Sequence, residues 1–436
     1  MSEQVKEHNS KIRLIPYIIF SVSFLGWEII KRTPVFISAT ISQQALRIYG
    51  LFSGIILLIF TAFLFGRFCL KGKHIFRFYP FDKYIIILLL LDFTALMVGL
   101  IRRNDMIFLI GDTYKFLVIP LAYFCTTQSL KSKDAVKLFL FIIILETVTT
   151  MGSFAYYLLR LVSGSYQRSP IHSISVLAFV FFMVSLTSKK SISYLFLTVV
   201  IGITALLSGA RTLWIQLLLC PLVIFLVMRK IVIVKVLFRQ AFVVMLITAL
   251  ISLAYGHILK DIAGEVTYRI TKTMNLLETD QSINPTISSD RRVVEVKASL
   301  GTMFDSPNIL NVLLGFGNGA EFYAPSAALG MGSAPGYKHH IHNGYVSLLF
   351  RMGLIGLLIF LIFSFSIINS ISKKISSPVA LHPLSFNVAT SILVYFMLTL
   401  IEFLTIYNLI GEIKWGILLG IFRVIADGSI SHENSY

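Results

Sequence analysis

Residues that could perform chemistry are concentrated in one polar stretch and in the segment that directly follows it. The stretch runs from about Gly256 to Lys338 and is the only long break in an otherwise hydrophobic chain. Residues 338–345, Lys-His-His-Ile-His-Asn-Gly-Tyr, then lead straight into an apolar segment. Imidazole accepts a proton near neutral pH, and guanidinium groups such as those of Arg291 and Arg292 form paired hydrogen bonds with phosphate. This combination indicates base catalysis on an anionic substrate.

A metal site is the alternative for the same histidines. His339, His340 and His342 cluster three imidazoles within four residues, which is a spacing that can bind a metal ion. Other possible ligands in the polar stretch are Asp261, Glu265, Asp280 and Glu321. These carboxylates form no second cluster in the sequence, so the analysis of the residues favours catalysis with no metal and no cofactor.

The composition indicates a membrane protein. Hydrophobic residues make up 56% of the chain and charged residues 14%, which is too little polar surface to cover a water-soluble globule. The formal net charge of +17 is spread between hydrophobic segments, so it does not form the single basic face of a nucleic-acid-binding protein. Cys69, Cys125 and Cys220 lie in separate apolar runs, which argues against a disulfide framework or a thiolate metal site.

Twelve apolar segments of roughly 17 to 25 residues predict transmembrane helices that position the polar stretch. The expected spans are residues 14–30, 49–69, 84–101, 106–126, 137–158, 170–187, 192–208, 212–228, 236–256, 343–369, 386–408 and 413–426. The first span lacks a small-residue cleavage site, so it is expected to be a retained helix. The expected fold is therefore an all-α polytopic membrane protein.

This pattern divides the chain into three parts. Residues 1–255 would hold the first nine helices, residues 256–342 a long catalytic loop with short helices, and residues 343–436 the last three helices and a tail. With the N-terminus in the cytoplasm, the inside connections carry 20 Lys and Arg residues and the short outside connections carry nine. The positive-inside rule then places both termini in the cytoplasm and the long loop outside.

Arginine dominates the outside connections, since seven of their nine basic residues are Arg. Arg211 is the most constrained of them, because it lies in a tight polar turn between two expected helices, Leu207-Ser-Gly-Ala-Arg-Thr-Leu-Trp214. An arginine held in this way suits bidentate binding of a phosphate outside the cytoplasm.

The long loop has its own local structure. Val293, Val296 and Leu300 have helical spacing, so an amphipathic helix is expected to begin near Ser289. Residues 305–308, Asp-Ser-Pro-Asn, should end it. The next motif is Gly-Phe-Gly-Asn-Gly at residues 315–319, whose glycines could direct backbone amides toward an anion or form plain turns.

Together these motifs resemble a known family. The chain carries, in order, the Arg211 turn, the Ser-Asp-Arg helix start at residues 289–291, the glycine motif at residues 315–319, and His-Asn-Gly-Tyr at residues 342–345. The last motif opens a helix that contains Arg-x-Gly-x-x-Gly. In a twelve-helix protein this order resembles the O-antigen ligase and O-antigen polymerase superfamily of bacterial envelope glycosyltransferases. The resemblance covers roughly Ile192 to Leu361.

The resemblance implies a glycosyltransferase of the GT-C-like type in the bacterial inner membrane. Its donor would be a glycan on undecaprenyl diphosphate, and its acceptor a hydroxyl of lipid A-core or of a growing glycan on the periplasmic side, without a metal. Arg211 matches the arginine of the family's helix-turn motif, Arg291 that of its loop motif, and His342 the histidine of His-Asn-x-Tyr. The further residues expected to contact substrate are Arg292, Asn343, Tyr345, Gly315 and Gly317.

The chain departs from the family pattern at two places. Ser289-Asp-Arg-Arg292 offers two arginines for one role, and Arg351 stands where many ligases carry an acidic residue. The second departure favours a polymerase or an exopolysaccharide enzyme slightly over a ligase. Arg351 and Glu402 are also predicted at similar depth on successive helices, where they could form a buried ion pair.

The chemistry of the residues agrees with this interpretation. Glycosyl transfer from a lipid diphosphate requires that the leaving charge is stabilised and that the acceptor hydroxyl loses its proton. Two arginines and one histidine suffice for both tasks. His342 would lie just before a helix and beside cations, which would keep it neutral, as a base must be.

A secondary transporter or a polysaccharide or lipid exporter is the competing interpretation. Twelve helices with buried charges would suit it, but such folds are built from structural repeats. The two halves of the sequence show no similarity, and the long loop after the ninth expected helix breaks a six-plus-six symmetry.

Overall fold

The computed structural model describes ten parts of the chain: residues 14, 16–21, 81–162, 175–188, 191–208, 211–228, 288–324, 336–376, 381–404 and 413–431. These parts are mostly helical. Their elements are α4 (Asp82–Ile101), α5 (Met106–Ser129), α6 (Ser132–Val162), α7 (Val176–Ser188), α8 (Ile192–Ser208), α9 (Arg211–Met228), α11 (Ser288–Phe304), α12 (Ile309–Leu314), β1 (Phe322–Ala324), β2 (Gly336–Lys338), α14 (Gly344–Ser376), α15 (Pro383–Glu402) and α16 (Ile413–Ser431).

The long helices follow the apolar runs of the sequence. Nine of the expected spans coincide with described helices, and residues 192–208 form α8 with the expected bounds. The expected spans 49–69 and 236–256 lie outside the described residues, and only residues 16–21 of the first span are described as helix. A helix satisfies its own backbone hydrogen bonds, which is what a chain in hydrocarbon requires.

Five described helices are long and apolar enough to cross a membrane: Asp82–Ile101, Met106–Ser129, Ser132–Tyr156, Gly344–Ser376 and Pro383–Glu402. Shorter apolar helices cover Val176–Thr187, Ile192–Ala205 and Leu213–Met228. The chain is therefore a mostly helical membrane protein, as the composition predicted. The number of twelve spans stays a prediction.

Contacts divide the chain into two compact units. The first joins Met1–Ile142 with Asn284–Tyr436, and the second is Ile143–Ile283. In the second unit, α7 packs against α8 and α9. The division by sequence order into residues 1–255, 256–342 and 343–436 stays a prediction.

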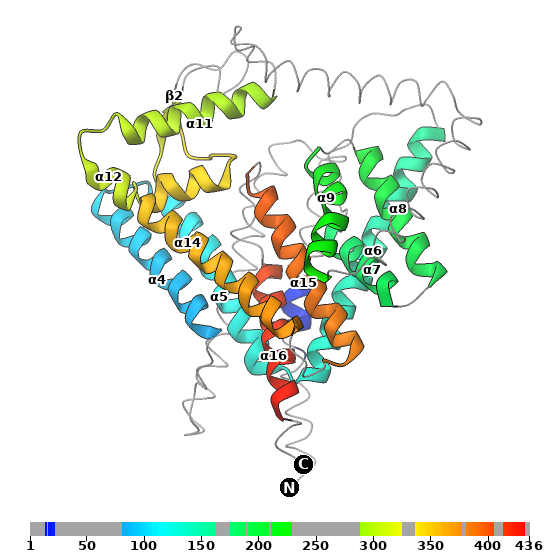
Figure 1. Cartoon of the computed structure of the whole chain (residues 1–436). Helices are drawn as coiled ribbons and strands as arrows, with labels where there is room; N and C mark the ends of the chain where they lie inside the picture. Colours follow the sequence, from blue (N-terminus) through cyan, green and yellow to red (C-terminus); the bar gives the residue numbers. More distant parts are fainter. Residues whose placement is uncertain are drawn as a thin grey trace. The chain divides into compact units, whose positions relative to one another are not determined.

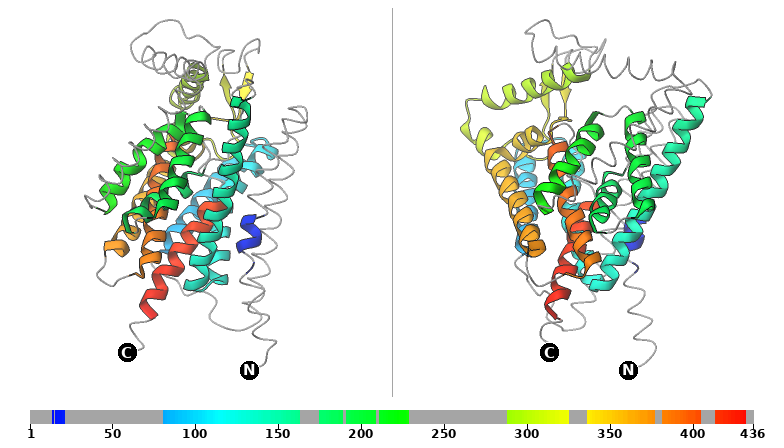
Figure 2. Two further views of the ribbon diagram at one scale, coloured as in Figure 1. Left: turned by 90° about the vertical axis from the view of Figure 1, so that its right-hand side faces the viewer. Right: turned by 45° about the vertical axis from the view of Figure 1, so that its right-hand side comes forward.

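In the first unit, α5 lies against α16 and α4, while α14 lies against α4 and α15 (Figures 1 and 2). Glycines allow the closest of these approaches. A Cβ atom added to Gly416 would lie 2.3 Å from the carbonyl oxygen of Ile119, and one added to Gly420 would lie 2.7 Å from the Cβ of Thr126. Small residues at a helix contact are typical of membrane helices, because they let two backbones approach.

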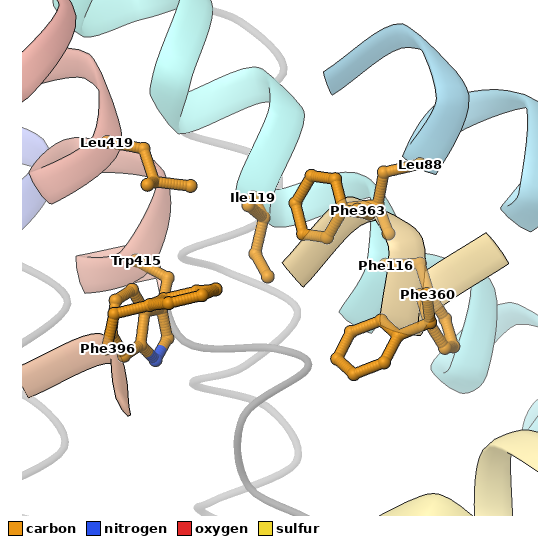
Figure 3. Close-up of a pocket in the computed structure, with 8 residues that line it drawn as sticks. All are labelled: Leu88, Phe116, Ile119, Phe360, Phe363, Phe396, Trp415 and Leu419. Atoms are coloured by element: carbon orange, nitrogen blue, oxygen red, sulfur yellow. The ribbon is translucent and has the colours of Figure 1, made fainter. Parts of the chain in front are cut away.

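A small apolar cavity marks the place where five helices of this unit meet (Figure 3). It is lined by Leu88, Phe116, Ile119, Phe360, Phe363, Phe396, Trp415 and Leu419. These residues come from α4, α5, α14, α15 and α16, so the apolar core of the unit sits between the long helices.

The described parts of the polar stretch, residues 288–324 and 336–338, form a layer over one end of α14 and α4. Helix α11 begins at Ser288, which confirms the expected start near Ser289, and it ends at Phe304, before the sequence that was expected to stop it. It packs against α14 and against the antiparallel pair β1–β2 (Figure 1). An apolar cluster that includes Val294, Phe322 and Phe350 holds this layer together.

Backbone hydrogen bonds of the glycine motif connect this layer to the membrane helices. The amides of Phe316 and Gly317 donate to the carbonyls of Phe350 and Arg351, both at 2.8 Å, and the amide of Asn318 donates to Ala95 at 3.0 Å. Gly317 has φ +82°, and a Cβ there would lie 2.3 Å from the amide nitrogen of Gly99. Only glycine fits this backbone position.

Helix α14 is kinked where it meets α12. Gly353 has φ +68° inside the helix, so two helical segments join there. A Cβ at Gly353 would lie 2.1 Å from the carbonyl oxygen of Leu313. The kink follows from this close backbone contact, which no other residue would allow.

A buried ion pair lies directly below the glycine motif. Arg351 of α14 is 1% exposed and Asp112 of α5 is 0% exposed, and the Arg351 Nε atom is 2.6 Å from Asp112 Oδ2. Asp112 also accepts a hydrogen bond from the amide of Gly319 at 3.1 Å, and its other oxygen lies 3.1 Å from Lys115 Nζ. The guanidinium group further donates to the carbonyl of His339 at 3.0 Å.

The predicted partner of Arg351 therefore needs correction. The carboxylate that contacts Arg351 is Asp112, whereas the sequence had suggested Glu402. Glu402 ends α15 beside Phe403, whose carbonyl accepts from the amide of Gly344 at the very start of α14. Counting residues along the helices gives only the depth of Arg351 in the membrane. It does not show which helix packs against Arg351, and here that helix is α5, whose Asp112 also binds the glycine motif.

Breaking this ion pair from either side should destabilise the fold strongly. Asp112→Asn leaves the buried Arg351 without its counter-ion, and Arg351→Met leaves Asp112 only the partly exposed Lys115, so each should lower the free energy of unfolding by about 3–5 kcal/mol. The double variant should cost less than the sum of the two, because it removes both members of the buried pair. Unfolding of the detergent-solubilised protein measures all three.

Lys373→Met is the matched control, because it removes an exposed cation from the same helix and should change stability by no more than about 0.5 kcal/mol. Single variants at Asp112 and Arg351 that are as stable as this control would show that the pair does not hold the layer to the helices.

Candidate active site

His342 lies between β2 and α14, where the polar layer enters the membrane helices. The preceding Ile341 is fully buried, whereas the His342 side chain is 40% exposed. The backbone is therefore anchored while the imidazole reaches the solvent. Such a group can exchange a proton with a bound substrate.

The residues after His342 fix the start of α14. The Asn343 side chain accepts a hydrogen bond from the amide of Val346 at 3.0 Å, as a cap does, and donates to the carbonyl of Leu404 at 2.8 Å. The Tyr345 hydroxyl donates to the carbonyl of Leu400 at 2.8 Å. Asn343 and Tyr345 thus tie α14 to the end of α15, and their predicted contact with substrate is not tested by these bonds.

Glu295 of α11 is the direct partner of His342. Its Oε1 atom accepts from the His342 amide at 2.8 Å, and its Oε2 atom lies 2.8 Å from the imidazole Nδ1. Lys338 of β2 contacts the same oxygen at 3.1 Å. The Glu295 side chain is 1% exposed, so the carboxylate is enclosed by the groups that it holds.

This contact determines which nitrogen of His342 faces the solvent. A carboxylate can only accept, so Nδ1 must carry the proton that it donates to Glu295. In the neutral ring, Nε2 then carries the free lone pair. The site therefore presents an imidazole base whose orientation and tautomer are set by a buried carboxylate.

The protonation of Glu295 is consistent with this role. Burial raises the pKa of Glu295, but the hydrogen bond and charge of His342, together with the charge of Lys338, lower it more. The net pKa lies below the ordinary glutamate value, so the group is an anion at neutral pH. An anion at this position stabilises the imidazolium that forms when His342 takes up a proton.

The sequence-based prediction missed Glu295, which lies on the buried face of α11. The helical spacing of Val293, Val296 and Leu300 had suggested an apolar face, but Val293 is 50% exposed. The buried face instead contains Glu295 and Ser299, four residues apart. A carboxylate between two valines, four residues before a serine, was the available signal of a polar interior contact.

The other two histidines have separate environments. His339 stacks on Phe108, with ring centroids 4.2 Å apart, and its Nε2 atom lies 3.3 Å from Asp112. His340 meets His342 edge to face at 4.8 Å. Desolvation lowers the pKa of His340 to about 4, and the nearby charges of His342 and Lys115 act in the same direction. His340 is therefore neutral at physiological pH.

The predicted metal alternative finds no support in this geometry. His339 belongs to the ion pair below the site, whereas His342 is held by Glu295. Within the described parts of the chain, no group of three or more His, Cys, Asp or Glu residues is placed to hold a metal ion.

The arginines expected to bind phosphate begin two helices. Arg291 and Arg292 lie in the first turn of α11, and Arg291 is one helical turn before Glu295. Arg211 is the first residue of α9 in the second unit. There the indole of Trp214 donates to the carbonyl of Ala205 at 2.8 Å, which joins the start of α9 to α8. Proximity of Arg211 to His342 stays a prediction.

The amides of the predicted anion-binding glycines are used within the protein. The amide of Gly315 donates to the carbonyl of Asn311 at 3.1 Å, and that of Gly317 to Arg351. These bonds favour the alternative of plain turns that position the loop. The carboxylate bound by this motif is that of Asp112, through the amide of Gly319.

The depressed pKa of Glu295 predicts how stability depends on pH. The folded protein holds this pKa below its unfolded value, so the ionised group stabilises the fold fully above the ordinary value of about 4.3. That contribution is lost as pH falls through the folded pKa. The difference in stability between the wild type and Glu295→Gln should thus be largest near neutral pH and shrink below about pH 4.

Thermal unfolding of the two proteins at a series of pH values measures this difference. Asp305→Asn, which changes an exposed carboxylate of the same layer, controls for the general loss of negative charge. A difference between wild type and Glu295→Gln of equal size at pH 3 and pH 7 would contradict the assignment.

Comparison with known proteins identifies the segment that carries this site. Residues 196–361 match the family described as O-Antigen ligase, which is nearly the range over which the motifs resembled that family. No curated protein matches the chain significantly. The matched range contains Arg211, Arg291, Glu295 and His342. The chain is therefore a mostly helical membrane protein in which residues 196–361 are similar to the O-Antigen ligase family.

Proposed function

We propose that this protein transfers a glycan from undecaprenyl diphosphate to an acceptor hydroxyl at the periplasmic face of the bacterial inner membrane. The observation that carries the proposal is the contact between Glu295 and His342, which creates an oriented base within the segment that matches the family. The acceptor would be lipid A-core in a ligase and a growing glycan in a polymerase. Both use the same chemistry at the donor.

The reaction needs one proton transfer and one substitution at carbon. His342 Nε2 takes the proton of the acceptor hydroxyl while the acceptor oxygen forms a bond with the anomeric carbon of the donor sugar. The bond between that carbon and the diphosphate oxygen breaks, and its electron pair leaves with undecaprenyl diphosphate. Glu295 holds Nδ1 and stabilises the resulting imidazolium.

Arginine residues would stabilise the leaving diphosphate. Arg291 lies near the start of the helix that holds Glu295, so one short segment would link the leaving group to the base. Arg211 would approach from the turn between α8 and α9, and Arg292 would be the second arginine of the loop motif. Fixed guanidinium groups that meet developing charge lower the barrier without a metal ion.

The distribution of charge supports a periplasmic site. The site lies at the start of α14, whereas Lys373 and Lys374 lie in the last turn of the same helix. If that lysine-bearing end is cytoplasmic, as the positive-inside rule requires, the end that carries His342 lies outside. Glycans assembled on a lipid carrier would then meet the base on the outer face.

The division of work between the arginines and the histidine predicts different defects. Arg211→Ala or Arg291→Ala should weaken binding of the lipid-linked donor and slow turnover, because each removes charge-assisted hydrogen bonds that exist from first binding. His342→Ala should leave donor binding nearly unchanged and reduce turnover by about 10²- to 10⁴-fold, the range for a lost general base.

Purified protein with lipid-linked glycan separates the two effects, since donor affinity and single-turnover rates are measured independently. Arg→Lys at either arginine should rescue poorly, because a point charge does not reproduce the guanidinium fork. Full activity of a folded His342→Ala protein would remove His342 as the base. Loss of wild-type activity on addition of a chelator would revive the metal interpretation.

Glu295 should act through His342 and not on the donor. Glu295→Gln keeps the size and one acceptor oxygen but removes the charge, so turnover should fall by about 10- to 100-fold with donor affinity unchanged. The acidic limb of the pH–rate profile should move to lower pH, because the imidazolium loses its anionic neighbour. A purely structural role would lower activity without moving this limb.

Lys338→Met is the control for this test, because Lys338 contacts the same carboxylate oxygen but not the imidazole. Because Lys338→Met removes a cation, it should not move the limb to lower pH. A Glu295→Gln profile that overlays the wild-type profile after scaling would argue against Glu295 as the positioning residue.

A further inference from the structure

Two tyrosines form an exposed aromatic pair beside the site. Tyr323 of β1 and Tyr337 of β2 are direct partners in the antiparallel register. Their side chains are 54% and 72% exposed, and their rings meet edge to face with centroids 5.8 Å apart. The two rings therefore present one continuous aromatic surface to the outside.

The opposite face of the same strands fixes this surface in place. Phe322 and Ala324 are fully buried, and the Phe322 ring packs edge to face on Phe350 at 5.8 Å. Side chains alternate along a strand, so burial of these residues forces Tyr323 outward. The tyrosines contribute little to the core, and their exposure calls for another explanation.

The aromatic pair is directly continuous with the proposed catalytic pair. Lys338 follows Tyr337 and contacts Glu295, the carboxylate that holds His342. Five residues separate Tyr337 from His342, which limits their separation to roughly 18 Å even in a fully extended chain. A glycan whose reacting end lies at His342 would reach the tyrosines within a few sugar residues.

We propose that Tyr323 and Tyr337 form a docking surface for the glycan chain of the donor. The apolar C–H face of a pyranose packs on an aromatic ring, and a tyrosine adds a polar hydroxyl at the edge. Glu321 is exposed and lies two residues before Tyr323, so its carboxylate can accept hydrogen bonds from sugar hydroxyls on the same side. The inference rests on the proposed function, because it names where that reaction holds its substrate.

The donor glycan fits this surface better than the membrane does. Tyrosines also gather at bilayer interfaces, but β1 and β2, the strands that carry the pair, lie with α11, away from the part of the helices that lines the cavity (Figure 2). An exposed carboxylate at Glu321 suits hydroxyl groups and would be repelled by anionic headgroups. A ligase and a polymerase both require a glycan donor, so the surface serves either reaction.

Binding of a lipid-free glycan tests the proposal without catalysis. The probe is the oligosaccharide that mild acid releases from the cells' own undecaprenyl diphosphate glycan, titrated onto the full-length protein in nanodiscs. Tyr323→Ala and Tyr337→Ala should each raise the dissociation constant by about 5- to 10-fold, whereas Tyr→Phe keeps the ring and should change it less than about twofold.

Phe304→Ala is the matched control, because Phe304 is an exposed aromatic residue (57%) of the same layer at the end of α11. It should bind the glycan like the wild type. A double Ala variant that also binds like the wild type would overturn the proposal. If the Ala variants do not fold, enzymatic iodination of the wild type decides: the glycan should protect both tyrosines, and equal iodination with and without glycan overturns it.

Two further outcomes separate the competing explanations. Quenching of Tyr337→Trp emission by brominated lipid, with an unchanged glycan affinity, would identify a membrane anchor and overturn glycan docking. If the wild-type protein neither binds nor transfers the glycan, the proposed function is overturned as well. Glycan binding that is normal in the tyrosine variants of an active enzyme would overturn only the docking surface. His342→Ala should not alter glycan affinity, since the free probe carries no diphosphate.

Discussion

The ion pair between Asp112 and Arg351 is the constraint on which the rest of the site depends. Both side chains are almost fully buried among apolar helices, where an unpaired charge is very costly. Further hydrogen bonds offset the desolvation of these two charges. Asp112 accepts one from the amide of Gly319, and Arg351 donates one to the carbonyl of His339. One pair thus joins two membrane helices, the glycine motif and the segment that leads from β2 to His342.

The position of His342 follows from that junction. His339 is held at the ion pair, and the start of α14 is held to the end of α15 by the amide of Gly344. His342 lies between these two anchors, so its backbone has little freedom. Glu295 reaches His342 from α11, which packs on Phe322 and Phe350. The base is built from segments far apart in the sequence.

The sequence predicted the elements of this fold far better than their contacts. Apolar runs determine where a membrane helix begins and ends, because backbone groups in hydrocarbon must bond within the helix, and α8 therefore has the expected bounds. Which carboxylate meets which cation is decided by packing. Asp112 lies 239 residues before Arg351, and Glu295 lies 47 residues before His342, so spacing along one helix could reveal neither pair.

The two ion contacts of the site differ in solvent access, and this difference assigns their roles. Arg351 is 1% exposed and so is committed to Asp112, because separating that pair would leave both charges buried. His342 is 40% exposed while its carboxylate partner is 1% exposed. The imidazole can therefore reach a substrate while Glu295 holds its Nδ1 atom. In the proposed reaction, the half-exposed contact takes part in the proton transfer, and the buried one fixes its position relative to the membrane helices.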